Sequence, residues 1–210
     1  NYNITSGLYN DELSAIPLCF EEPVLLYNKS LLKKAPETFN DILEFADTFD
    51  GEQNPEVSSI LEWDVKELQY NYSFVGDYIS YGGPNGDDEE IIDVNNAALI
   101  RALDYYRSLK DIFSIDLNKV DYDKVLENFS KGQTIITIAN TKDINKITNG
   151  AIEGSTLKEE DLGISKIPDM TKTLTSKTLS FTDVICINPF GESFKNSKGE
   201  YVEKDSSGAI

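Results

Sequence analysis

The sequence contains no histidine, and this absence excludes several kinds of site. Ser-His-Asp and Cys-His nucleophile systems use an imidazole as general base, and many zinc sites use it as a ligand. Cysteine is almost absent as well. Cys19 and Cys186 each lie in an apolar, strand-like run, so we interpret both as small buried side chains. A disulfide between adjacent strands is the alternative.

Basic residues are scarce relative to acidic ones. The 19 lysines and arginines stand against 37 aspartates and glutamates, which gives a formal net charge of −18. Such a chain repels polyphosphate, so nucleic-acid binding is disfavoured and the acidity is interpreted as a solvated surface. Long apolar runs are missing too. No stretch approaches the roughly 18 consecutive apolar residues that a membrane-spanning helix requires.

Neither end of the sequence resembles a natural terminus. The chain begins NYNITSGLYN and ends KDSSGAI, and no secretion signal is recognisable. We therefore expect an excised part of a longer protein. Its 210 residues, 40% of them apolar and 10% aromatic, suffice for one large globular domain, or for one domain with fragments of another.

Apolar periodicity alternates between the two-residue repeat of strands and the longer repeat of helices, which predicts an α/β fold. The clearest helix places Ala98, Ile100, Leu103, Tyr106 and Leu109 on roughly one face. The β-branched run QTIITIAN predicts a strand that is buried on both faces. Expected helices span 38–49, 66–81, 95–113, 121–132 and 141–150, and expected strands 14–28, 58–65, 133–140, 162–170 and 181–191. The segment 82–96 and the tail after 191 are expected to be loops.

A pair of carboxylates interrupts the first apolar strand. Glu21 and Glu22 are neighbours, so on a strand they point to opposite faces and cannot share one acid–base centre. A glycosidase pair would have to face each other across the bond at about 5–10 Å. One carboxylate is therefore expected to face water, and the other a cleft or a neutralising partner.

Two further polar groups lie at predicted strand ends. Trp63 and Asp64 close a short strand, and an exposed indole beside a carboxylate is a common way to hold a sugar. The alternative is that Trp63 belongs to the core. Asn140 follows the buried strand, and ligands collect at the carboxyl ends of strands in open α/β sheets. An ordinary strand-to-helix turn, with Asp143 near a helix N-terminus, is the alternative there.

An ordered series of motifs resembles bacterial extracellular solute-binding proteins of the maltose-binding-protein type. The segments at 27–29, 31–32 and 36–42 match the region where those chains pass into their second lobe. Five further motifs follow in the family's order: GDYISYGG, NNAALIRALDYYRSL, FSKGQTIITIAN, LGISKIPD and FTDVICINPFG. The resemblance covers about residues 10–190, and it is the order of the motifs that carries it.

The resemblance implies a periplasmic-binding-protein-like (type II) lobe, an incomplete chain with a mixed sheet flanked by helices. Residues 1–20 would be the end of the first lobe and a crossing strand. Residues 21–180 would form the second lobe, and residues 181–210 the strand returning to the first lobe and a polar tail. Cys19 and Cys186 would both lie on crossing strands, which permits a disulfide.

The resemblance also implies a ligand site. Glu21 would bond the ligand near the hinge, and Glu22 would face solvent or the other lobe. Trp63, Asp64 and Asn140 would line the second-lobe side, and Asp183 would add a polar contact from the return strand. The family often presents a stacking Trp after the buried strand, whereas this chain reads ANTKDINK there. That departure weakens the expectation of a maltose-like, two-sided stack.

The function that follows is a non-catalytic substrate-binding component of an ABC importer. It would be a monomer that closes its lobes on a carbohydrate, an oligosaccharide being favoured, and delivers it to a membrane permease. It would work outside the cell, lipid-anchored in its full-length form or periplasmic, without metal or cofactor. A peptide, a polyamine or another cationic ligand is the first alternative. An acid–base hydrolase using Glu21 with Asp64, and a pure interaction domain, are the others.

Overall fold

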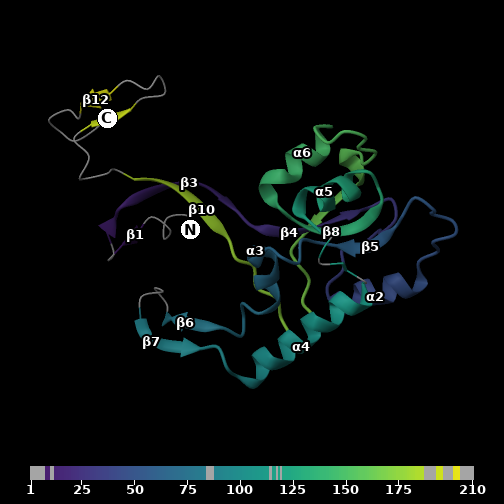
Figure 1. Cartoon of the computed structure of the whole chain (residues 1–210), viewed down its shortest axis with the longest axis horizontal. Coiled ribbons are helices and arrows are strands. Elements are labelled where there is room, and N and C mark those ends of the chain that lie inside the picture. Colours follow the sequence, from purple (N-terminus) through teal and green to yellow (C-terminus); the bar gives the residue numbers. More distant parts are fainter. Residues whose placement is uncertain are drawn as a thin grey trace. The chain divides into compact units, whose positions relative to one another are not determined.

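A computed structural model describes residues 8–9, 12–83, 88–113, 115–116, 118, 120–186, 193–195 and 201–203, and the structural statements below concern these residues. The chain divides into two units, a smaller one of residues 1–20 and 181–210 and a larger one of residues 21–180. Helices and strands alternate along it, which confirms the α/β prediction (Figure 1). The assignment of the units to the lobes of a binding protein stays a prediction.

The larger unit is built on a four-stranded mixed sheet with the order β5-β8-β4-β9. Strand β8 (Thr134–Asn140) pairs with β4 (Pro23–Asn28) antiparallel and with β5 (Ser59–Glu62) parallel, and β9 (Leu162–Ser165) lies antiparallel on the far side of β4. Every residue of β8 is buried, as its β-branched sequence predicts for a strand covered on both faces.

Helices cover both faces of this sheet, and alternate residues of β4 point into two different cores. Leu25 and Tyr27 join the larger core, and Val24 and Leu26 join the smaller one. Helices α2 and α4 pack on the first face, α6 and most of α5 on the second (Figure 1). The helices are α2 (Phe39–Thr48), α3 (Leu68–Asn71), α4 (Ala97–Ile112), α5 (Tyr122–Ser130) and α6 (Ile144–Thr148), with 3₁₀ turns at Tyr72–Phe74, Thr141–Asp143 and Glu159–Asp161.

Local sequence signals explain where the well-predicted helices begin and end. Thr38 caps α2 by accepting from the Asp41 amide at 3.2 Å, while Asp41 accepts from the Thr38 amide at 2.8 Å. This reciprocal pair satisfies two amides that a helix start leaves unbonded. Asp121 caps α5 by accepting from the Lys124 amide at 2.9 Å. Gly132 follows that helix with a φ of 73°, a left-handed conformation that favours glycine.

The predicted helix over 66–81 is wrong. The segment forms the short α3, one 3₁₀ turn and then strand β6 (Ser80–Gly82). Strand β6 pairs with β7 (Asp88–Asp93), so the predicted loop contains a hairpin. The ring of Tyr72 lies over Gly76, so any larger residue at position 76 would clash with it. The predicted helix at 141–150 likewise begins later than expected, at Ile144, after a 3₁₀ turn.

The buried face of α4 differs from the predicted one. Leu99, Ala102 and Leu109 are buried, whereas Ile100 and Leu103 are 53% and 46% exposed. The buried residues follow helical spacing as well as the predicted set does, so the pattern alone could not choose between two adjacent apolar stripes. Which of the two stripes is buried depends on how the helix packs against the larger core.

The smaller unit consists of two-stranded pairs. Strand β3 (Ala15–Glu21) pairs with β10 (Phe181–Cys186), β1 (Leu8–Tyr9) with β2 (Glu12–Leu13), and β11 (Ser193–Lys195) with β12 (Tyr201–Glu203). The β11–β12 pair corrects the expectation of a loop-like tail. Residues 187–191 of the predicted return strand lie outside the described part.

Cys19 and Cys186 are exposed and form no disulfide, so the prediction of two buried side chains is wrong. They lie on β3 and β10, and a two-stranded ribbon has no second layer of its own to bury them. The thiol of Cys19 donates to Asp183 Oδ2 at 3.3 Å. The cross-strand neighbour of Cys19 is therefore an aspartate rather than the other cysteine.

The contact between β4 and β9 gives a test of the sheet. Gly163 lies opposite Tyr27 in the register, and a Cβ at this glycine would meet the Tyr27 ring at 2.2 Å. We expect Gly163→Ala to lower the free energy of unfolding by roughly 1–3 kcal/mol through overpacking, measured by urea denaturation. Gly51→Ala is the control because nothing lies within 4 Å of its Cβ position. Equal effects of the two substitutions would contradict the packing.

Candidate functional site

Polar side chains gather where β8 ends. Asn140, the last residue of β8, lies opposite Pro23 at the start of β4, so the carboxyl end of β8 adjoins the Glu21–Glu22 pair. The Thr141 amide donates to the Glu22 carbonyl at 3.0 Å, and the Glu22 amide donates to Thr141 Oγ1 at 3.2 Å. These bonds join the turn after β8 to the acidic pair. Such a strand end is where open α/β sheets place ligands.

Glu21 has a neutralising partner. Its Oε2 lies 2.8 Å from Lys142 Nζ, and that oxygen is buried although the Lys142 side chain is 58% exposed. The ion pair offsets the cost of burying a carboxylate oxygen. Glu22 is partly buried, and its Oε2 accepts from Ser180 Oγ at 3.2 Å. One member of the acidic pair thus meets a cation and the other a hydroxyl.

Asn140 shapes the turn. Its side chain is almost fully buried; its Oδ1 accepts from the Lys142 amide at 3.1 Å and its Nδ2 donates to Gln69 Oε1 at 3.4 Å. Both ends of the amide are therefore engaged within the protein. A direct contact from Asn140 to a ligand stays a prediction, while its bond to Gln69 brings α3 to the same site.

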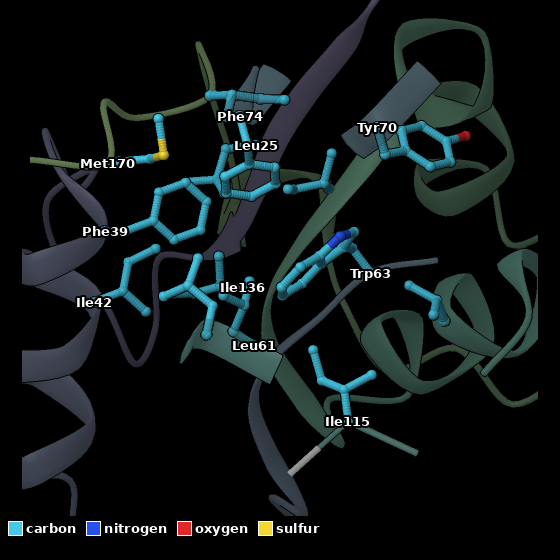
Figure 2. Packing of buried hydrophobic residues seen from close by; sticks show 14 of the residues in the cluster. Leu25, Phe39, Ile42, Leu61, Trp63, Tyr70, Phe74, Ile115, Ile136 and Met170 are labelled. Carbon is cyan, nitrogen blue, oxygen red and sulfur yellow. The ribbon is translucent and has the colours of Figure 1, made fainter. Parts of the chain in front are cut away.

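Trp63 lies in the core, so the prediction of an exposed indole is wrong and the alternative left open by the sequence is correct. The side chain is fully buried and lies in the same core as Phe74 (Figure 2). Its ring centroid is 5.8 Å from that of Phe74 and 6.4 Å from that of Tyr106. Its Nε1 donates to Asn71 Oδ1 at 3.1 Å. Leu61 is buried in the same core, because alternate residues from the strand share one face.

Asp64 and Asp183 make hydrogen bonds to partners other than the acidic pair. The Asp64 carboxylate accepts from the Lys66 amide at 2.9 Å, which forms a local turn just before α3. Asp183 lies exposed on β10 in the smaller unit, where it accepts from Cys19. Of the predicted ligand-binding residues, the structure gathers Glu21 and Asn140 at one turn.

The prediction missed a buried network that supports this turn. Tyr122 OH donates to Asp143 Oδ2 at 2.6 Å and accepts from the Asn140 amide at 2.9 Å. Lys146 Nζ pairs with Asp143 Oδ1 at 2.5 Å, which supplies that buried oxygen with a cation. The Tyr70 ring stacks on Tyr122 at a centroid distance of 5.2 Å. In the sequence, only the position of Asp143 after a buried strand pointed toward this network.

Burial determines the protonation of these phenols. It raises the pKa of Tyr122, and the hydrogen bond to the Asp143 carboxylate raises it further. Burial likewise raises the pKa of Tyr70 to about 12. Both hydroxyls therefore remain protonated near neutral pH, so the Tyr122 hydroxyl can donate to Asp143. The network is a fixed structural support.

Two of the three carboxylates at this edge are paired with lysines, and the third, Glu22, accepts from the Ser180 hydroxyl. Lys142 neutralises Glu21 and Lys146 neutralises Asp143, even though the whole chain is strongly acidic. Among the described ranges, no cluster of three or more acidic or cysteine side chains could hold a metal ion. The exposed Lys142 side chain and the carboxylates beside it are the groups that a ligand at this edge would meet. Leu68, the sequence neighbour of Gln69 in α3, is also exposed.

Residues 3–198 match the family model of bacterial extracellular solute-binding proteins. The chain belongs to this family, which confirms the resemblance and the extracellular location. A maltodextrin-binding protein, MdxE of Bacillus subtilis, is 32% identical over 95 residues, which are 43% of this chain and 22% of that protein. A maltooligosaccharide ABC transporter solute-binding lipoprotein of Streptococcus pneumoniae is 30% identical over 104 residues, 47% of this chain and 24% of that protein.

The matched segments thus span less than a quarter of the length of these relatives. Within the described residues, no helix is both long and apolar enough to cross a membrane. The mixed sheet with helices on both faces agrees with the periplasmic-binding-protein-like fold expected for the family.

Removing the hydroxyl group of Tyr122 tests the hydrogen-bond network that supports the turn after β8. Tyr122→Phe removes a group that bonds both Asp143 and the Asn140 amide, and it leaves these buried partners unsatisfied. We expect the free energy of unfolding to fall by about 1–3 kcal/mol, measured by urea denaturation. Tyr105→Phe is the matched control, because its hydroxyl bonds Asn40 at an exposed position. A loss for Tyr122→Phe no larger than for the control would contradict the network.

The buried tyrosines also predict a pH dependence. Burial raises the pKa of Tyr70, Tyr105 and Tyr106 from 10.0 to about 12. Because the folded state favours the protonated phenols, their contribution to stability is complete below pH 10 and is lost as the pH rises toward 12. Urea midpoints measured across this range should fall steadily. Phenol titration of the folded protein entirely at the ordinary pKa would contradict this.

Proposed function

We propose that the chain is part of the non-catalytic, substrate-binding component of an ABC importer, and that its ligand is an oligosaccharide of the maltodextrin class. The observation that supports this most directly is the Glu21–Lys142 pair at the carboxyl end of β8. The names of the relatives, a maltodextrin-binding protein and a maltooligosaccharide-binding lipoprotein, suggest the class of sugar.

The pair suits a sugar because each hydroxyl of a sugar both donates and accepts hydrogen bonds. A carboxylate only accepts and an ammonium only donates, so Glu21 and Lys142 together can bond adjacent hydroxyls. Their ion pair holds the two groups in a fixed relation before a ligand arrives. Leu68, which is 69% exposed, offers an apolar contact to the C–H face of a sugar ring. It is an aliphatic contact, since Trp63 is buried and the turn after β8 carries no aromatic residue.

The same geometry argues against the alternatives. A polyamine or another cationic ligand would bind best to uncompensated negative charge, whereas two of the three carboxylates at this edge, Glu21 and Asp143, are each paired with a lysine. An acid–base hydrolase would need a second carboxylate facing Glu21 across the scissile bond, and the group that Glu21 meets is Lys142. The family gives further support to binding without catalysis.

In this proposal the whole protein works by closing around its sugar. The ligand would contact both lobes, and it would favour the closed form because only that form makes all the contacts. The closed, monomeric protein would then present the sugar to a membrane permease. Anchoring by a lipid would keep it at the cell surface, in line with the description of the pneumococcal relative as a lipoprotein.

Isothermal titration calorimetry on the full-length protein that contains this chain tests the ligand class. We expect heat on titration with linear maltodextrins and none with spermidine or short peptides. Lys142→Met should weaken maltodextrin binding roughly tenfold to a hundredfold, the range for hydrogen bonds to a charged group. Lys158→Met is the control, since Lys158 is 71% exposed and pairs only loosely with Glu160 at 3.7 Å. Binding of spermidine alone would overturn the carbohydrate proposal.

A further inference from the structure

We infer that Glu22, Thr141 and Ser180 form a clasp that holds together the two points where the chain leaves the larger unit and ties both to the ligand-binding turn. The inference builds on the proposed function, because it assigns to residues beside the proposed site the task of relaying ligand contact to the hinge. None of the three side chains is needed to touch a ligand.

The first exit point is bonded to the turn after β8. The larger unit begins at Glu21, and the next residue, Glu22, exchanges two hydrogen bonds with Thr141. The Glu22 amide donates to Thr141 Oγ1 at 3.2 Å, and the Thr141 amide donates to the Glu22 carbonyl at 3.0 Å. The hydroxyl of Thr141 thus extends the pairing of β4 with β8 one step toward the hinge.

The second exit point is bonded to the first. The larger unit ends at Ser180, whose Oγ donates to Glu22 Oε2 at 3.2 Å. A second route runs through Gln69, which donates to the Leu179 carbonyl at 3.4 Å and accepts from Asn140 Nδ2 at 3.4 Å. Residues from opposite ends of the unit are therefore fastened to the same turn.

The two residues proposed to contact the ligand, Glu21 and Lys142, are sequence neighbours of two clasp residues. Glu21 precedes Glu22, and Lys142 follows Thr141, so any shift of the ion pair moves the clasp by way of the backbone. A ligand shifts a conformational equilibrium only through contacts that differ between the two states. Hinges are a few residues at the ends of elements. The clasp places such residues within one peptide bond of the groups that would meet the sugar.

The experiment measures the spread of distances across the hinge in the full-length protein, first without a ligand. One spin label is placed at the exposed Cys186, with Cys19→Ser to prevent a second attachment, and the other at the exposed Glu153 through Glu153→Cys. Pulsed electron–electron double resonance then reports the distance distribution. We expect Ser180→Ala and Thr141→Val each to broaden it, and the double variant to broaden it little more than the stronger single one.

Matched controls separate the clasp from a general loss of stability. Ser165→Ala and Thr148→Val remove hydroxyls that bond only backbone carbonyls of Lys166 and Ile144, and they should leave the distribution unchanged. Ser180 is exposed, so Ser180→Ala should keep the melting temperature of the unsubstituted protein. An unchanged distance distribution in both clasp variants would overturn the inference.

Adding saturating maltotriose distinguishes the two proposals. In the unsubstituted protein the distribution should move to one narrow peak. In the clasp variants it should stay broad while Kd rises roughly threefold to tenfold, as expected for the loss of one hydrogen bond near the surface. If maltotriose leaves the distance distribution of the unsubstituted protein unchanged, the carbohydrate proposal fails. The clasp is then still tested by the broadening of the ligand-free distribution in the variants. A narrow peak and unchanged Kd in the variants would overturn the relay.

Discussion

The burial of β8 between two layers of helices is the constraint on which the rest of the larger unit depends. All seven residues of this strand are buried, and its backbone is shared between an antiparallel partner, β4, and a parallel one, β5. Because a central strand has no free edge, its two neighbours fix its register and its end point. The turn that follows is therefore held by the core, and polar groups placed there keep their geometry without a ligand.

The polar side chains around that turn come from four separate parts of the chain: the β3–β4 junction, α3, α5 and the segment before β10. Each is connected to it by a hydrogen bond or an ion pair, and each buried carboxylate oxygen there has a lysine beside it. Within a strongly acidic protein, this edge therefore combines two ion pairs with neutral donors and acceptors. Such a surface favours neutral, hydroxyl-rich ligands over ions.

The sequence predicted the fold class, the buried strand, the capped helices α2 and α5 and the family, since these depend on local patterns and on their order. It did not predict that Trp63 is buried, because a tryptophan at the end of a strand has the same sequence context whether it faces a core or a cleft. Ile100 and Leu103 were misplaced because α4 carries two adjacent apolar stripes. Tyr122 was missed because its partner Asp143 is 21 positions away, and only the packed structure brings the two together.

The single tryptophan of the chain also determines what light can report about it. The Trp63 indole is shielded from water, packs against Phe74 and Tyr106 and donates to Asn71, whereas Lys142 is exposed. Its emission depends on the integrity of the core, so it is a sensitive optical signal of unfolding. For the same reason it is a poor signal of occupancy, and quenching of this fluorophore by a sugar would mark a disturbed core.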